Sequence, residues 1–169
     1  IDLVLRAHEP NPALAYDRHW NLVTANRMVA PLLAGIPPRL LGHPFNILRL
    51  AFDPEGLAAR TVNLAEWCGH LLDRLHRQCE ATADPELLRL YRELKAFPIP
   101  ARSAPLSADQ VAIPLKLRGE GNEVLSFFST TMVFGTPVDV TLSELALETF
   151  FPADELTAKR MREIAASLT

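Results

Sequence analysis

A hairpin pattern in residues 111–134 limits the folds open to this chain more than any other feature. Apolar residues stand at every second position from 111 to 117, which is the period of a β-strand with one solvated face. Pro114 favours an edge position for this strand, because proline cannot donate a ladder hydrogen bond. Residues 119–122 predict a turn, and residues 124–134 predict a second, antiparallel strand.

The second strand is apolar on both faces. Successive side chains of a strand point to opposite sides, which divides this strand into two sets. One set is Phe128, Thr130, Met132 and Phe134, and the other is Phe127, Ser129, Thr131 and Val133. The two sets cannot pack against the same helices, so one is expected to face a cavity and the other a contact surface.

Helical periodicity dominates the middle of the chain. The strongest helix is predicted from about Gly56 to Glu80. One face of it carries apolar residues at spacings of three, four and seven: Leu57, Leu64, Cys68, Leu71, Leu72, Leu75 and Cys79. Asp84-Pro85 predicts the start of another helix, which Pro98 ends. A terminal helix is expected over residues 155–168.

Shorter elements precede and follow these helices. Residues 13–16 and 22–25 predict two short strands around a polar turn, and Asn26 predicts the N-cap of a short helix that Gly35 ends. A short turn of helix is expected at residues 46–50.

The apolar pattern after residue 137 predicts a further strand. Its parity changes between positions 142 and 145, which predicts a bulge or break at Ser143 or Glu144. A helix over residues 142–150 is the competing interpretation, and it would set Glu144 and Glu148 four apart as like charges.

This element order predicts an α+β fold. All strands can join one antiparallel sheet, with the helices packed on one face. We expect one domain over residues 1–169, because 169 residues with 49% hydrophobic content suffice for a single core. No apolar run is long enough to span a membrane and no signal peptide leads the chain, so a cytoplasmic protein is expected. The net charge of −3 gives these residues no clustered positive field for nucleic acid.

A polar and aromatic stripe lies beside the leucine stripe of the long helix. Asn63, Trp67, His70 and Arg74 recur at spacings of four, three and four, next to Leu71. Such a stripe can wall a ligand pocket, with Trp67 supplying apolar area and His70 or Arg74 binding a carboxylate. The alternative is a half-exposed helix flank. On the strands, the candidate ligand residues are Phe127, Phe128, Met132 and Phe134, for which plain core packing is the alternative.

Catalytic and metal-binding patterns are absent from the sequence. The five histidines lack the four-residue spacing of a helical zinc site, and no CxxC, GxSxG, P-loop or GxGxxG motif occurs. Asp73 and His76 are three apart, a spacing typical of solvated neighbours. Cys68 and Cys79 are expected to be small core residues. We expect no enzyme activity, no metal and no cofactor.

Three stretches together resemble one protein family. They are NPALAYDRHWNLVTANR, GLAARTVNLAEW and LSFFSTTMVFGTPVDVTLSELALETFFPAD, which lie between residues 11 and 154. They are similar to the C-terminal ligand-binding domain of MmyB-like transcription regulators, a family with a PAS-like fold.

The resemblance implies a function as well as a fold. It implies an effector-sensing domain that binds a hydrophobic, fatty-acid-like molecule between sheet and helices. It also implies an upstream helix-turn-helix domain of the Xre type, absent from this chain. DNA is then expected to be contacted only by that upstream domain. That role predicts a homodimer, since dimer geometry sets the spacing of DNA half-sites. The alternative is an oligomerisation module with no small-molecule ligand.

Overall fold

The computed structural model describes residues 1–100, 113–119, 121–133 and 145–168. Five strands form one antiparallel sheet in the order β2-β1-β5-β4-β3, so β5 lies at its centre. The strands are β1 (Ala13–Asp17), β2 (Leu22–Ala25), β3 (Leu115–Arg118), β4 (Val124–Val133) and β5 (Leu145–Pro152). The expected α+β architecture with one antiparallel sheet is confirmed.

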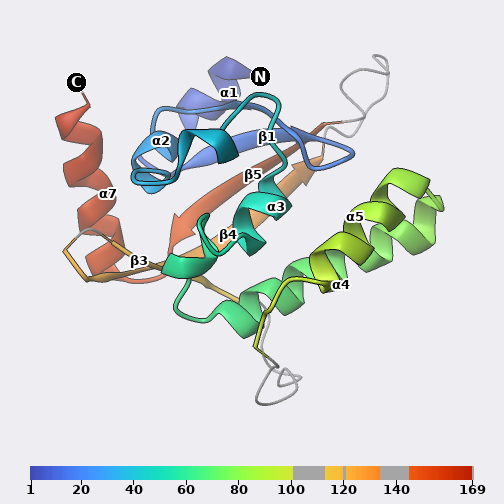
Figure 1. The fold of residues 1–169 in the computed structure, drawn as a ribbon. Coiled ribbons are helices and arrows are strands. Elements are labelled where there is room, and N and C mark those ends of the chain that lie inside the picture. Colours follow the sequence, from blue (N-terminus) through green and yellow to red (C-terminus); the bar gives the residue numbers. More distant parts are fainter. Residues whose placement is uncertain (101–112, 120, 134–144, 169) are drawn as a thin grey trace.

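The helices occupy the segments between and after the strands. They are α1 (Asp2–Ala7), α2 (Val29–Leu32), α3 (Ile47–Phe52), α4 (Leu64–Thr82), α5 (Pro85–Lys95) and α7 (Glu155–Ser167), with 3₁₀ turns η1 (Pro38–Leu40) and η2 (Ala58–Arg60). Figure 1 shows α4 and α5 side by side on the same side of the sheet as α3. None of the described helices is long and apolar enough to cross a membrane.

The strand register assigns each side chain to one of two sheet faces. Glu148 pairs with Leu14 on one side and with Thr131 on the other, so these three side chains share a face. This inner face also carries Tyr16, Leu125, Phe127, Ala146 and Phe150. It packs against α2, α3, α4 and α7, while α5 packs in turn on α3 and α4, and the main core lies there.

The outer face is covered only in part by the described residues. Leu5 of α1 packs on Ala13, Ala15 and Leu147, so the first helix protects the β1 side of this face. Further along the sheet, Phe128, Met132 and Phe151 are 40%, 46% and 37% exposed. The expected division of β4 is therefore seen only in part: Phe127 of the inner set is fully buried, but Thr131 and Val133 of the same set are exposed.

Helix α7 is fixed to the sheet by one buried hydroxyl. The Thr157 Oγ1 atom accepts a hydrogen bond from the backbone N–H of Ser126, with an N–O distance of 2.9 Å. Met161, one turn further on, packs against Leu125 and Phe127. Asp154 caps the helix by accepting from the N–H of Thr157.

The prediction of one continuous helix from residue 56 is wrong, since α4 begins at Leu64. The residues before it bind β3 instead of continuing a helix. The N–H of Val62 donates to the carbonyl of Lys116, and the Asn63 amide donates to the Pro114 carbonyl and accepts from the Lys116 N–H. A backbone committed to strand partners cannot also form the i to i−4 bonds of a helix.

The helix expected after Asn26 begins later, at Val29. The Asn26 side chain is buried and accepts from the N–H groups of Met28 and Ala13, while its amide donates to the carbonyls of Leu5 and Asn11. Asn26 therefore joins α1 to the sheet in addition to capping the chain that enters α2.

Residues 145–152 form a strand, so the competing helical interpretation is wrong for these positions. Partner strands on both sides of β5 satisfy its backbone groups, which a helix would have to satisfy internally. The bulge expected at Ser143 or Glu144 and the strand expected from residue 138 lie outside the described residues.

A candidate ligand site between the sheet and helix α4

An apolar cavity of about 90 Å³ lies between the inner face and the helices. Its described lining consists of Leu14, Trp20, Leu22, Val29, Leu33, Phe45, Ile47, Leu48, Leu50, Ala51, Leu57, Trp67, Leu71, Leu115, Glu148 and Phe150. Glu148 is the one ionisable side chain in this lining. We call this space the inner cavity.

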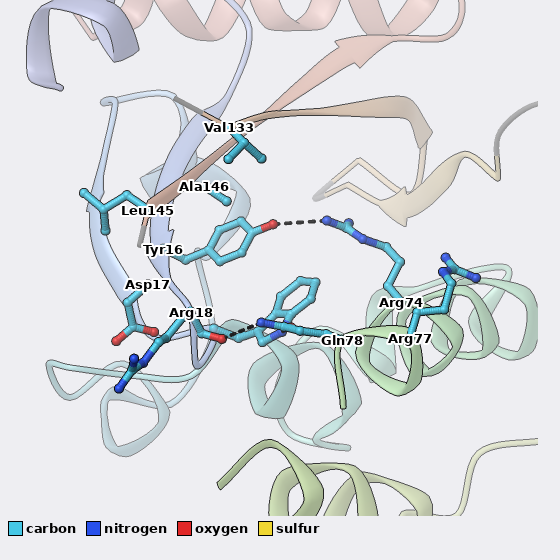
Figure 2. A pocket seen from close by; sticks show the side chains of 10 residues that line it. Tyr16, Asp17, Arg18, Arg74, Arg77, Gln78, Val133, Leu145 and Ala146 are labelled. Carbon is cyan, nitrogen blue, oxygen red and sulfur yellow. Dashed lines mark hydrogen bonds between the residues drawn. The ribbon is translucent and has the colours of Figure 1, made fainter. Parts of the chain in front are cut away.

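An open pocket of about 420 Å³ lies next to it, where the β1–β2 turn faces α4. Its lining includes three arginines and one carboxylate, Arg18, Arg74, Arg77 and Asp17. Figure 2 shows Arg74 reaching across this space to Tyr16, with Arg77 beside it on α4. We call this space the outer pocket.

Four side chains lie where the two spaces meet: Glu148 lines the inner cavity, Tyr16 and Arg74 line the outer pocket, and Trp20 lines both. Arg74 Nη1 donates to the two carboxylate oxygens of Glu148 at 3.1 and 3.4 Å, and Nη2 donates to the Tyr16 hydroxyl at 3.1 Å. The Arg74 guanidinium lies 4.9 Å from the centre of the Trp20 ring, and that ring stacks on Tyr16. We call Tyr16, Trp20, Arg74 and Glu148 the partition.

Burial and charge pairing shift the pKa values of Arg74 and Tyr16 in the partition. Burial disfavours the charge of Arg74, but Glu148 and Tyr16 outweigh it and raise the pKa of this guanidinium. Burial, followed by the negative charge of Glu148, raises the pKa of Tyr16 well above its ordinary value. The partition is thus a salt bridge with a neutral phenol hydrogen-bonded to it.

Three of the sequence-predicted ligand residues lie together at this site. Trp67 and Leu71 are buried in the wall of the inner cavity, and Arg74 belongs to the partition. His70 is half-buried, and its ring centre lies 5.7 Å from that of Trp67. Burial and then the positive charge of Arg74 lower the pKa of His70.

The remaining predicted residues lie elsewhere or are not described. Asn63 binds the backbone of β3 at the far end of α4. Phe127 is fully buried beneath α7, and Phe128 and Met132 are on the outer face. Phe134 lies outside the described residues.

Sequence reasoning missed Tyr16, Trp20 and Glu148. The sequence does contain a signal for Glu148, because it is the lone acid within the apolar strand segment from Leu145 to Phe151. A charge on the buried face of a strand requires a partner. Trp20 directly follows the polar residues Asp17, Arg18 and His19, and no pattern in the sequence indicates its burial.

The described residues contain no group of three or more side chains suited to a metal ion. Both cysteines are buried, as expected for core residues. Burial raises the pKa of the Cys68 thiol to about 12, so this group is a poor nucleophile near neutral pH.

Comparison with known proteins identifies a family. A search of curated proteins found no match. A family model described as the MmyB-like transcription regulator ligand binding domain matches residues 1–164. This is a family of regulator domains rather than of enzymes. With nearly the whole chain matched and an apolar cavity beneath its sheet, the protein belongs to the MmyB-like transcription regulator ligand binding domain family.

Proposed function

We propose that this domain senses a hydrophobic, fatty-acid-like small molecule that binds between the sheet and the helices. The observation that carries the proposal is the inner cavity, whose described lining is apolar except for Glu148. An apolar pocket with few polar groups is the usual form of a small-molecule site. Trp67 and Leu71 contact the aliphatic part of the ligand.

The size of the inner cavity shapes this proposal. A volume of about 90 Å³ is well below the ~300–1,000 Å³ of typical ligand pockets. A long aliphatic chain therefore also needs the outer pocket, which adds about 420 Å³. The ligand reaches both spaces only when the partition opens.

Opening the partition provides a route from ligand to gene regulation. A ligand shifts a conformational equilibrium only if it binds one state more tightly, and the bound state here is the one with an open partition. In our proposal the change passes through α4 to the geometry of a homodimer in the cytoplasm. An upstream helix-turn-helix domain contacts DNA, and dimer geometry sets the spacing of its recognition helices.

Organic extraction of freshly purified protein, followed by mass spectrometry of the extract, tests the ligand. We expect an aliphatic molecule in a stoichiometric amount. We also expect the stripped protein to gain thermal stability when an aliphatic ligand is added back, since a ligand that binds only the folded state stabilises it. An empty extract together with no shift from any fatty acid or fatty alcohol would refute the proposal.

One observation favours a second candidate function, an oligomerisation module without a small-molecule ligand. The exposed Phe128, Met132 and Phe151 gather on the outer face, and exposed apolar patches often mark protein interfaces. The two candidates agree on a dimer and differ on the ligand.

Light scattering of Met132→Glu tests the dimer in both. We expect this substitution to shift the protein towards monomer, while Val62→Glu, at an exposed site before α4, leaves the mass unchanged. A dimeric Met132→Glu protein would exclude this face as the interface.

A further inference from the structure

Glu148 occupies the position where a ligand's polar group would meet Arg74. Its side chain is only 4% exposed, points from the centre of the sheet into the inner cavity, and is the one acceptor with a full charge there. The three remaining partners of the Arg74 guanidinium are the Tyr16 hydroxyl, the Thr131 hydroxyl and the Trp20 ring.

The charged and polar groups that surround Glu148 disfavour the binding of a second anion. Helix α4 contributes Arg74 and the half-buried His70, and β1 contributes the Tyr16 phenol. β4 contributes only the Thr131 hydroxyl. A ligand carboxylate beside Arg74 would share one guanidinium with Glu148, and two carboxylates in a buried site repel each other strongly.

A neutral ligand group that donates a hydrogen bond is favoured beside Glu148, whereas a carboxylate is repelled. An alcohol or amide can donate to a Glu148 oxygen and bring no charge into the cavity. Hydrogen bonds to a charged acceptor are stronger than those between neutral groups. The inner cavity therefore suits a neutral donor better than an acid.

We propose that Glu148 determines head-group selectivity, admitting an aliphatic ligand with a neutral hydrogen-bond donor and excluding a carboxylate from Arg74. This inference rests on the proposed function, since it presupposes that an aliphatic ligand enters the inner cavity. A free fatty acid would leave its carboxylate in the outer pocket, where Arg77 is available on α4.

Binding of decanoate and 1-decanol to wild type and Glu148→Gln, at about pH 8 where carboxylates are ionised, tests the proposal. Glutamine keeps an oxygen for Arg74 but removes the charge. We expect the affinity ratio of decanoate to decanol to rise about tenfold or more in the variant. Because the same two ligands are compared in both proteins, the difference between their hydration free energies cancels when the two ratios are compared. Glu93→Gln is the matched control, because it removes a carboxylate from Arg49 at the surface, and its ratio should equal that of wild type.

A second measurement covers the case in which Glu148→Gln fails to fold. The variant Arg74→Met/Glu148→Met replaces the whole ion pair by apolar side chains, a change that proteins often tolerate. Wild type should prefer 1-decanol to decyl methyl ether about tenfold, because the ether lacks a donor. The double variant should lose this preference.

The outcomes separate this inference from the proposed function. If wild type binds these ligands but neither ratio changes in the variants, the role of Glu148 is wrong and ligand sensing stands. If wild type binds none of the ligands, the proposed function fails and the inference fails with it.

Discussion

Ala51 is the smallest side chain in the wall of the inner cavity, and it belongs to the short helix α3. Replacing it with valine adds two methyl groups to a side chain that lines the cavity. We expect Ala51→Val to fold with a melting temperature close to that of wild type, because the new atoms fill a void. We expect it to lose binding of an aliphatic ligand by about tenfold or more, measured by fluorescence titration.

Ala81→Val is the matched control for this substitution. Ala81 is also a helical alanine, but it is exposed and does not line the cavity. Both substitutions carry the same small loss of helix propensity. Equal ligand binding by Ala51→Val and wild type would place the ligand outside the inner cavity.

The ion pair in the partition predicts a strong asymmetry between single and double substitution. Arg74→Met leaves Glu148 charged and buried without its partner, which should lower the free energy of unfolding by about 3–5 kcal/mol. The double variant Arg74→Met/Glu148→Met should regain most of this loss. Urea denaturation of the three proteins measures both quantities. A single variant as stable as wild type would show that Glu148 finds another partner or water.

His70 predicts a pH dependence of stability. Its pKa in the folded protein is lowered, first by burial and then by the charge of Arg74, with Arg77 acting in the same direction and Glu148 and Asp73 opposing. The unfolded chain then binds the proton more readily than the folded one. Stability is unaffected by this group above about pH 6.5, the pKa in the unfolded chain, and is lost as the pH falls from there through the lower pKa of the folded protein.

Replacing His70 by glutamine should remove this contribution. We expect the stability difference between wild type and His70→Gln to change between about pH 7.5 and pH 5, with wild type losing more on acidification. Denaturation at several pH values measures the difference. A constant difference over this range would contradict the lowered pKa.

Individual site residues were predictable where periodicity alone decides their position. Trp67, Leu71 and Arg74 share one side of a helix, so their spacing brings them to one site. Periodicity did not predict which of Phe127, Phe128 and Met132 the helices cover. Alternation along a strand shows that there are two sets of side chains, but not which set faces the helices. Glu148 acquires its role only through contact with Arg74, which is 74 residues away in the chain.

Among the elements, helix interiors and strands were easier to predict than helix starts. The leucine stripe of α4 extends towards Leu57, yet the helix begins at Leu64. The reason is tertiary, because Val62 and Asn63 give their hydrogen bonds to β3. Asp84 was a correct start signal for α5, since its side chain caps that helix locally.

The attachment of α7 to the sheet predicts a further stability effect. Thr157→Val keeps the shape of the side chain but removes the acceptor for the Ser126 N–H, which is buried. We expect a loss of about 1–3 kcal/mol in the free energy of unfolding, measured by urea denaturation. Thr130→Val, on the exposed side of β4, should cost much less. Equal losses would mean that the hydroxyl of Thr157 does not hold the helix.

For the molecule as a whole, the order of elements was sufficient to predict one antiparallel sheet covered by helices. It was not sufficient to predict how tightly the interior is filled. The packing leaves about 90 Å³ beneath the sheet, beside a salt bridge that joins α4 to β5. Cavity size depends on how side chains from many elements fit together, and a single sequence does not reveal that fit.

The central claim is that an aliphatic ligand binds between the sheet and the helices. Photo-crosslinking with a decanol analogue that carries a diazirine in its chain, followed by peptide mass spectrometry, tests it most directly. We predict adducts on the cavity wall, at residues such as Leu71 and Phe150, that excess 1-decanol suppresses. Adducts confined to Phe128, Met132 and Phe151 on the outer face would contradict the claim.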